Sequence, residues 1–209
     1  MDPLILYRSL KVIEEIYDES MYGENDIFRI KDIVHSLDEN HWRGKKWMAD
    51  LIRNYHSSTS GKILVIGGWY GLMAYQLRKI FPNSSMNITT IDMDSRCAEI
   101  GYKLFYDQDI SFQVGDVKDL DIWDYSVIVN TSVEHMDREF VRQLIASKDP
   151  NTVIGLQSND YYDELSHINC DDCVDDFVEW VEPMLSEDKV RYWGTMQLST
   201  FKRFSIVGM

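Results

Sequence analysis

At residues 63–71 the chain reads ILVIGGWYG, an apolar run that passes directly into a glycine-rich turn. An unbroken run of aliphatic and β-branched residues is typical of a parallel strand buried on both faces. Glycine lets the backbone turn tightly and approach a ligand without a clash from a β-carbon. A helix that begins after the turn offers free N–H groups and the positive end of its dipole. The segment therefore predicts a ligand-binding strand, turn and helix.

Beyond this segment, short apolar runs alternate with helical periodicity to the end of the chain. Further strands are expected at residues 87–91, 110–114, 126–129, 152–156, 190–198 and 203–207. The polar break at Ser199-Thr200 predicts that the last two strands form a hairpin. Alternating strands and helices form parallel sheets with right-handed crossovers. The predicted fold class is therefore α/β: a Rossmann-like, seven-stranded, mostly parallel sheet with helices on both faces and a C-terminal antiparallel hairpin.

Residues 1–56 read as helical and precede the alternating pattern. Three apolar series recur at helical spacing: Leu6, Leu10, Ile13 and Tyr17; Ile30, Ile33, Val34 and Leu37; and Trp47, Met48, Leu51 and Ile52. The sequence GEND at 23–26 predicts a turn between the first two helices. We expect residues 1–56 to form an N-terminal helical cap and residues 57–209 to form the Rossmann-like domain. Amphipathic helices need a partner surface, so the cap is expected beside the carboxyl edge of the sheet, over part of the ligand pocket.

The composition is that of a globular protein with a strongly acidic charge. The 209 residues, 44% of them hydrophobic, suit one domain with a small helical addition. The net charge of −14 disfavours a nucleic-acid partner, because such binding uses basic side chains to neutralise phosphates. Residues 43–46 are the best candidate for a local basic patch, and a solvated helix end is the favoured interpretation of them. With no membrane-spanning run and no basic region before an N-terminal apolar run, we expect a cytoplasmic protein that binds neither nucleic acid nor membrane.

The cysteines predict neither disulfides nor a metal site. There are three, Cys97, Cys170 and Cys173, and an odd, low count argues against a disulfide framework. Cys170 and Cys173 form a lone CxxC, and a zinc site built on it would need two more ligands. No second pair exists, so we expect no metal and interpret the cysteines as ordinary reduced thiols.

Acidic residues follow the second and third predicted strands. Asp92 ends the second strand about twenty residues after the glycine turn, where a carboxylate can accept hydrogen bonds from both ribose hydroxyls of a nucleoside. Asp94 reads as the N-cap of the next helix. The third strand ends in Gly115-Asp116-Val117, where a carboxylate or a backbone N–H can reach an adenine ring. A plain polar turn is the alternative interpretation of that last segment.

Over residues 60–208 this arrangement resembles the class I S-adenosylmethionine-dependent methyltransferases, and among them the small methyltransferase-like proteins of phages. That family has a Gly-rich motif after strand one, acidic residues after strands two and three, and a terminal reversed hairpin. The sequence NTSVEHM at 130–136 is similar to the motif after strand four in its small-molecule members. The resemblance implies S-adenosylmethionine as cofactor and a small-molecule methyl acceptor. The cofactor-binding residues that it implies are Gly67, Gly68, Trp69, Gly71, Asp92, Met93, Asp116, Val117 and Asn130.

Two positions depart from the family pattern. Val65 stands where the family commonly has an acidic residue, and Trp69 stands where it has the middle glycine. The pocket is therefore either reshaped or closed. The alternative function is a degenerate, non-catalytic protein that keeps the fold and binds the cofactor or a partner. A nicotinamide-dependent oxidoreductase is a third interpretation, which the terminal hairpin and the lack of a regular GxGxxG disfavour.

The loops after the fourth and fifth predicted strands supply the candidate catalytic and acceptor-binding residues. His135 is the candidate general base, because the unperturbed pKa of histidine lies near neutrality. A structural role at a helix N-terminus is the alternative for His135. The candidate acceptor-binding residues are Glu134, Asn159, Tyr161 and His167. We expect these loops to meet at the carboxyl edge of the sheet, and loops are where function concentrates.

Overall fold

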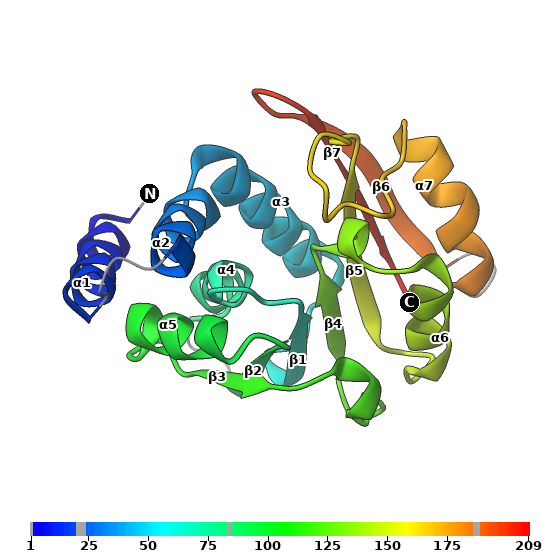
Figure 1. The fold of residues 1–209 in the computed structure, drawn as a ribbon. Coiled ribbons are helices and arrows are strands. Elements are labelled where there is room, and N and C mark those ends of the chain that lie inside the picture. Colours follow the sequence, from blue (N-terminus) through cyan, green and yellow to red (C-terminus); the bar gives the residue numbers. More distant parts are fainter. Residues whose placement is uncertain (1, 20–23, 83–84, 186–188) are drawn as a thin grey trace.

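A seven-stranded sheet in the order β3-β2-β1-β4-β5-β7-β6 forms the centre of the molecule (Figure 1). The computed structural model describes residues 2–19, 24–82, 85–185 and 189–209. The strands are β1 (Ser60–Ile66), β2 (Ser85–Asp92), β3 (Ile110–Val114), β4 (Val127–Asn130), β5 (Val153–Asn159), β6 (Val190–Gln197) and β7 (Lys202–Gly208). Strands β1 to β5 pair in parallel, whereas β7 is antiparallel to both β5 and β6. The predicted fold class, with its C-terminal hairpin, is confirmed.

Helices cover both faces of this sheet. They are α1 (Pro3–Glu19), α2 (Glu24–Ser36), α3 (Glu39–Tyr55), α4 (Leu72–Ile80), α5 (Ser95–Phe105), α6 (Arg138–Ser147) and α7 (Val174–Val181), with short 3-10 turns at Val117–Asp119, Val133–His135 and Glu182–Met184. Within the part of the chain that the structure describes, none is long and apolar enough to cross a membrane.

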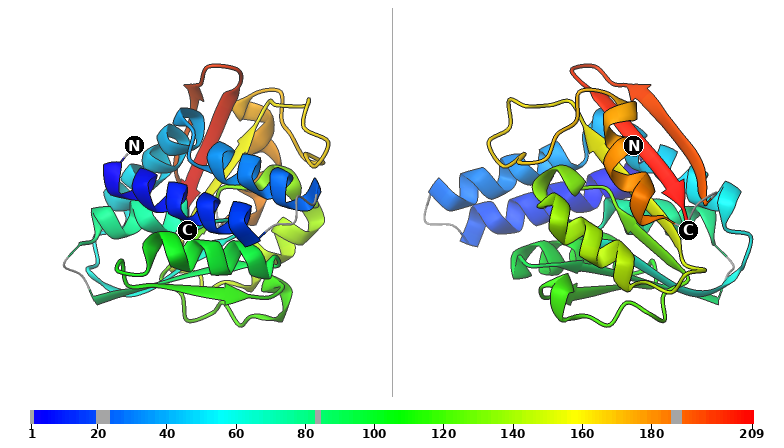
Figure 2. Two further views of the ribbon diagram at one scale, coloured as in Figure 1. Left: turned by 60° about the vertical axis from the view of Figure 1, so that its left-hand side comes forward. Right: turned by 90° about the vertical axis from the view of Figure 1, so that its right-hand side faces the viewer.

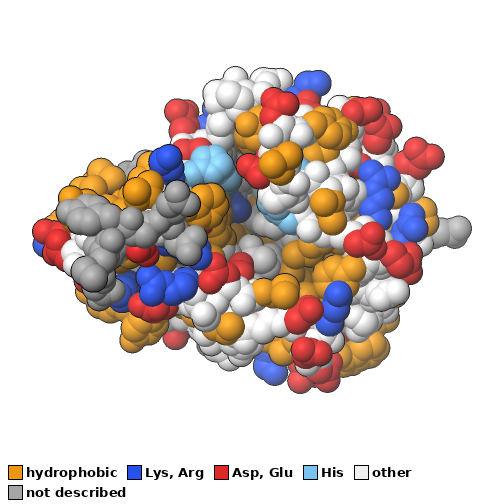
Figure 3. Space-filling view, in the orientation of Figure 1, with side chains coloured by type: hydrophobic (Ala, Val, Ile, Leu, Met, Phe, Trp, Pro, Cys, Tyr) orange, Lys and Arg blue, Asp and Glu red, His pale blue; other side chains and the backbone are white. Residues whose placement is uncertain are grey.

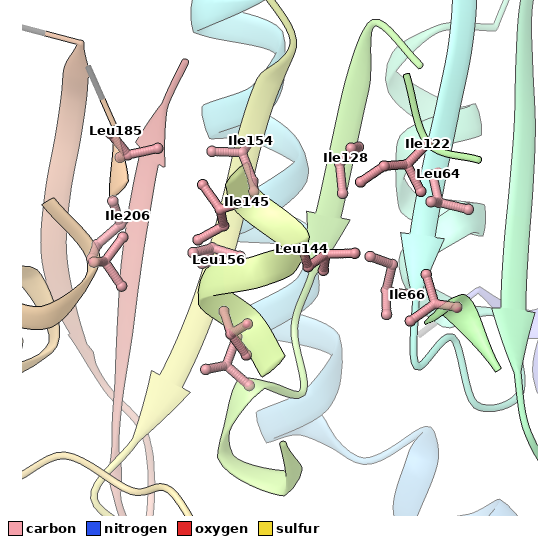
Figure 4. Packing of buried hydrophobic residues seen from close by; sticks show 14 of the residues in the cluster. Leu64, Ile66, Ile122, Ile128, Leu144, Ile145, Ile154, Leu156, Leu185 and Ile206 are labelled. Atoms are coloured by element: carbon pink, nitrogen blue, oxygen red, sulfur yellow. The ribbon is translucent and has the colours of Figure 1, made fainter. Parts of the chain in front are cut away.

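Alternate residues of the central strands supply two hydrophobic cores. Leu64 and Ile66 of β1 pack on the face covered by α6 and α7, and Figure 4 shows Leu144 and Ile145 of α6 lying against the strand residues of that face. Ile63 and Val65 pack on the opposite face, under α3 and α4. A strand buried on both faces explains why the sequence at 63–66 is continuously apolar rather than alternating. Val65, which replaces the family's acidic residue, is a fully buried core residue.

The three N-terminal helices have different surroundings. Helix α3 packs directly on the sheet, and its residues Met48 and Ile52 are fully buried in the core shared with β5 and β7. Helices α1 and α2 lie farther out, and α1 runs beside α5 (Figure 2). The division of the chain into a helical cap and a Rossmann-like domain at residue 56 stays a prediction. Helix α3 packs on the same face of the sheet as α4 does.

Two details of the predicted N-terminal helices are wrong. The buried side of α1 carries Ile5, Val12 and Ile16, whereas Leu6, Leu10 and Tyr17 are exposed. The buried stripe was hidden in the sequence because Arg8 lies within it, paired with the Asp107 carboxylate at 2.7 Å. The turn expected at 23–26 is also misplaced: α2 already begins at Glu24, and Gly23 lies outside the described residues.

Truncating Ile52 in α3 tests whether this helix belongs to the core. Ile52→Ala should lower the free energy of unfolding by about 2–5 kcal/mol, because it removes buried methyl groups and leaves a cavity. Leu4→Ala on α1 is the matched control, since Leu4 is 46% exposed and such changes stay within about 0.5 kcal/mol. Urea denaturation followed by circular dichroism measures both. Equal, small effects would show that α3 is not part of the folded core.

Candidate functional site

A cavity of about 610 Å³ opens at the carboxyl edge of the sheet. Its walls come from α2 and α3, the glycine turn after β1, the loops after β4 and β5, and the tip of the β6–β7 hairpin. Figure 3 shows the hollow, with histidine side chains at its edges. The volume lies in the range of small-molecule and cofactor sites. The N-terminal helices α2 and α3 therefore occupy the place expected for them, beside this edge and over part of the cavity.

The glycine turn has a left-handed backbone at positions where glycine is favoured. Gly67 has φ 59° and Gly71, the N-cap of α4, has φ 90°. Gly68 donates its N–H to the Ile91 carbonyl of β2 at 3.2 Å, and a β-carbon there would collide with the Thr90 side chain. Trp69 also adopts a positive φ, 50°, which is uncommon for a residue other than glycine. Gly67 and Trp69 face the cavity, while Gly68 and Gly71 shape the turn behind it.

The Trp69 side chain lines the cavity and is held by the N-terminal helices. Its Nε1 donates to Asp32 of α2 at 3.0 Å, and the ring lies 5.3 Å from that of His41, centroid to centroid. The Tyr70 hydroxyl donates to the same Asp32 carboxylate at 2.6 Å. Burial raises the pKa of Tyr70, so this hydroxyl stays a donor at neutral pH. The large ring is thus held against the N-terminal helices, where it forms a wall of the cavity.

Asp92 is held at the end of β2 by backbone donors. Its Oδ2 accepts the N–H of Trp69 at 2.8 Å, and its Oδ1 accepts the N–H of Asp94 at 3.0 Å. The carboxylate lines the cavity, and each oxygen keeps a further lone pair for a ligand. Asp94 caps α5 by accepting from the Arg96 N–H, as predicted, and also pairs with Arg29 of α2 at 2.7 Å.

Four other residues predicted to bind the cofactor do not line the cavity. Met93 is 75% exposed beside α5, and Val117 is buried in the core. Asp116 caps the short turn after β3 by accepting from the Lys118 N–H. Asn130 is fully buried at the end of β4, where its Oδ1 accepts the Ser132 N–H and so shapes the following loop. Their roles toward a ligand stay predictions.

A buried polar cluster forms the inner end of the cavity. Glu134, which is 3% exposed, accepts from Asn159 Nδ2 at 2.6 Å and from Arg203 at 3.1 Å, both at its Oε1. Its Oε2 is buried and has no partner among the described residues. Lys45 of α3 donates to Thr131 Oγ1 at 3.0 Å. Burial, helped by the nearby Arg203 charge, lowers the pKa of Lys45 to about 8.

Sequence reasoning missed the two cations of this cluster. The interpretation of residues 43–46 as a solvated helix end is wrong for Lys45, which is 7% exposed. Arg203 lies on β7 and is 5% exposed, although its neighbours gave no sign of a binding role. A charged residue within an apolar strand is the one signal in the sequence that marks Arg203, because buried charges need partners. Nothing in the sequence around Lys45 indicates that the fold buries its side chain.

His135 and His167 meet close to Glu134. Their rings make an edge-to-face contact with centroids 4.6 Å apart. Nδ1 of His135 bonds to the Ser166 carbonyl at 3.2 Å, and Nδ1 of His167 bonds to the Tyr161 carbonyl at 2.6 Å. Desolvation by the surrounding protein lowers the pKa of His135, which favours its neutral form. The expectation that Glu134, His135, Asn159, Tyr161 and His167 gather at one edge of the sheet matches their place in the cavity wall.

Arg203→Met tests the buried ion pair at the base of the cavity. The Glu134 and Arg203 side chains are 4% and 6% exposed, and removing one member of a buried pair costs about 3–5 kcal/mol of unfolding free energy. Adding Glu134→Gln removes the stranded charge, so the double variant should be more stable than Arg203→Met alone. Thermal and urea unfolding give both values. A loss below about 1 kcal/mol in the single variant would contradict a buried, charged Glu134.

This chain is similar to known proteins in its fold but not in its sequence. No family model and no curated protein sequence matches this chain. A putative O-methyltransferase from Klebsiella pneumoniae superimposes with a TM-score of 0.61 at 15% identity, over 100% of this chain and 90% of that one. An O-methyltransferase from Bacillus cereus in complex with SAH gives a TM-score of 0.56 at 13% identity, over 94% and 97% of the two chains.

Nucleic-acid enzymes share the same architecture. An RNA methyltransferase from Salinibacter ruber in complex with S-adenosyl-L-homocysteine gives a TM-score of 0.50 at 10% identity, over 77% of this chain and 88% of that one. The strand order, the reversed terminal hairpin and the glycine turn after β1 agree with these similarities. The chain has the fold of the class I S-adenosylmethionine-dependent methyltransferases.

Proposed function

We propose that this protein transfers a methyl group from S-adenosylmethionine to a small-molecule acceptor. The observation that carries the proposal is a single cavity that joins the glycine turn and Asp92 to the buried Glu134 and the two histidines. A cofactor held at the first part and an acceptor held at the second would share one enclosed space. Such enclosure aligns two reactants and keeps water out.

The residues around the glycine turn fit the cofactor. Gly67 lines the cavity with a φ of 59°, a left-handed conformation that favours glycine over residues with a β-carbon. Asp92 offers carboxylate lone pairs to ribose hydroxyls, and Trp69 supplies an aromatic wall. Gly68 and Gly71 would keep the turn in place. Met93, Asp116, Val117 and Asn130 remain candidates for cofactor contacts outside the cavity lining.

The chemistry places modest demands on the protein. When bound, S-adenosylmethionine supplies a methyl group on a sulfonium sulfur, which is electrophilic without further activation. Because Nδ1 of His135 faces a carbonyl oxygen, which only accepts, this nitrogen carries the proton and Nε2 carries the lone pair. His135 Nε2 would therefore take the proton of an acceptor hydroxyl or amine. Glu134, Asn159, Tyr161 and His167 would bind and orient that acceptor.

The charge of the cavity favours a small neutral or cationic acceptor over a nucleic acid. Five carboxylates line it, from Asp32, Asp38, Asp92, Glu134 and Glu164, against two cationic side chains, Lys45 and Arg203. Both cations are buried, and Arg203 is paired with Glu134. Phosphate recognition requires accessible Lys and Arg groups. The RNA methyltransferase with the same fold therefore lends less support than the O-methyltransferases do.

Asp92→Ala tests the cofactor site. Loss of hydrogen bonds from a carboxylate to two ribose hydroxyls, each contributing about 1.5–3 kcal/mol, should weaken S-adenosylhomocysteine binding at least tenfold. Isothermal titration calorimetry measures the affinity. Asp124→Ala is the matched control, because that carboxylate is 77% exposed and far from the cavity lining. Unchanged affinity in Asp92→Ala would falsify the assignment of Asp92.

Incubation with radiolabelled S-adenosylmethionine tests the acceptor class. Separate pools of small metabolites, tRNA and DNA would be supplied, and label should appear in the metabolite pool. His135→Gln should lower that turnover, by about 10²-fold if it removes the proton acceptor, with cofactor affinity unchanged. Label in the nucleic-acid pools alone would overturn the small-molecule proposal. Cofactor binding with no transfer to any pool would instead support the non-catalytic alternative.

A further inference from the structure

We propose that Glu134, His135 and His167 form a binding site for one divalent transition-metal cation of the zinc and cobalt class. The three residues come from the loop after β4 and the loop after β5, which the sheet topology brings together. Each offers one donor atom, and the three donor atoms lie within 4.8 Å of one another. Two imidazoles and one carboxylate are a known catalytic zinc set, which leaves a position for a water or a substrate atom.

The two imidazole rings are already fixed in the orientation that a metal requires. Metal-bound histidines usually donate their other ring N–H to a backbone carbonyl or a carboxylate. Nδ1 of His135 faces the Ser166 carbonyl, and Nδ1 of His167 faces the Tyr161 carbonyl. Carbonyls accept only, so both protons reside on Nδ1 and both Nε2 atoms present lone pairs. Among the described residues, neither Nε2 has a hydrogen-bond partner.

Glu134 supplies an independent observation that points to a missing partner. Its Oε1 is satisfied by Asn159 and Arg203, but its Oε2 is buried and accepts no hydrogen bond from any described residue. A buried carboxylate oxygen without a partner is costly, because burial removes its hydration. A cation beside Oε2 would restore the lost interaction. Asn159 and Arg203 would then hold the ligand in position, as outer partners of metal-bound carboxylates do.

The distances and charges around the three donors are compatible with a cation. Zinc bonds of about 2.0–2.2 Å hold tetrahedral donors roughly 3.5 Å apart, so donors that lie within 4.8 Å of one another need to approach by at most about 1.3 Å. Arg203 and Lys45 oppose a further positive charge, but Arg203 bonds to the other oxygen of Glu134. Glu164 faces the histidines, and carboxylates outnumber cations five to two in the whole cavity lining.

Two other groups nearby are poorer candidates. His35, Asp38 and His41 also gather within 4.8 Å at the cavity. In that cluster the His41 Nδ1 already pairs with Asp38 at 3.0 Å, and Asp38 also bonds to the His41 N–H, so its donors satisfy one another. Cys170 Sγ lies 3.6 Å from Nδ1 of His167, on the side of the ring away from Nε2, so it does not face the proposed site.

A cation at this site would also define the acceptor. All three donors line the cavity, so the open coordination positions face the space assigned to the acceptor. Metal ions bind an oxygen atom and lower the pKa of its proton. This consequence rests on the proposed methyltransferase function: the acceptor would be a hydroxyl-bearing small molecule, bound through that oxygen. Coordination would then lower the pKa of that hydroxyl enough for its proton to leave to solvent water, and His135 would act as a ligand instead of as the proton acceptor.

Calorimetric titration of the chelator-treated protein with ZnCl₂, without cofactor, tests the site. We expect one equivalent to bind. Glu134→Gln and His167→Gln should each weaken binding by more than tenfold, since each removes a ligand. His35→Gln is the matched control, because it removes a 62% exposed histidine from the neighbouring cluster; it should leave the affinity within twofold. Titration with CoCl₂ provides a second readout, since a low-coordinate Co²⁺ site gives visible absorption bands.

The outcomes are separable from those of the methyltransferase proposal. Absence of zinc and cobalt binding in the wild-type protein overturns the metal site, as does a loss of binding in His35→Gln with none in His167→Gln. His135→Gln provides a further ligand variant, and His135 is exposed at the cavity mouth, so the change should not prevent folding. S-adenosylhomocysteine binding measured on the same metal-free samples reports on the cofactor site alone.

Discussion

The contact between Glu134 and Arg203 joins the loop after β4 to strand β7 at the inner end of the cavity. Arg203 is on β7, Glu134 follows β4, and Asn159, which bonds to the same carboxylate oxygen, ends β5. The reversed hairpin places β7 beside β5, so the Arg203 guanidinium lies close to the loop after β4. Because both charges are almost fully buried, each requires the other. The positions of His135 and of the 160–173 loop follow from this arrangement, since the backbone N–H groups of Ile168 and Asn169 donate to the Glu134 carbonyl.

A second set of contacts connects the N-terminal helices to the glycine turn. Asp32 of α2 accepts from both Trp69 and Tyr70, and Arg29 pairs with Asp94 at the start of α5. The bulky residue inside the turn thus becomes the attachment point for the covering helices. The same tryptophan that departs from the family pattern gives this protein an aromatic wall, formed with His41 beside the cavity.

Local signals made much of the fold predictable. The run at 63–71 specified a strand, a turn and a helix through apolar continuity and glycine, and Asp94 could be identified as a cap from its position alone. The grouping of Glu134 and His167 followed from a rule of topology, since the carboxyl ends of parallel strands share one edge. The expected absence of a metal rested on the cysteine spacing, which carries no information about ligands from two separate loops.

The remaining features depend on contacts between residues far apart in the chain. Lys45 and Thr131 are separated by 86 positions, and Arg203 and Glu134 by 69. The residues around Lys45 do not distinguish it from a solvated side chain, and the apolar strand around Arg203 indicates a buried charge without identifying its partner. The sequence did not reveal the buried face of α1 for the same reason. Arg8 lies on that face and is paired with Asp107, which is 99 positions away. Propensity and periodicity describe neighbours, so they cannot reveal which polar residues find a distant partner.

The cavity at the carboxyl edge is proposed to bind S-adenosylmethionine. The most direct measurement is calorimetric titration of the unmodified protein with S-adenosylhomocysteine and, separately, with NAD. We expect one S-adenosylhomocysteine to bind per chain and NAD not to bind. Binding of NAD, or no binding of S-adenosylhomocysteine, would contradict it.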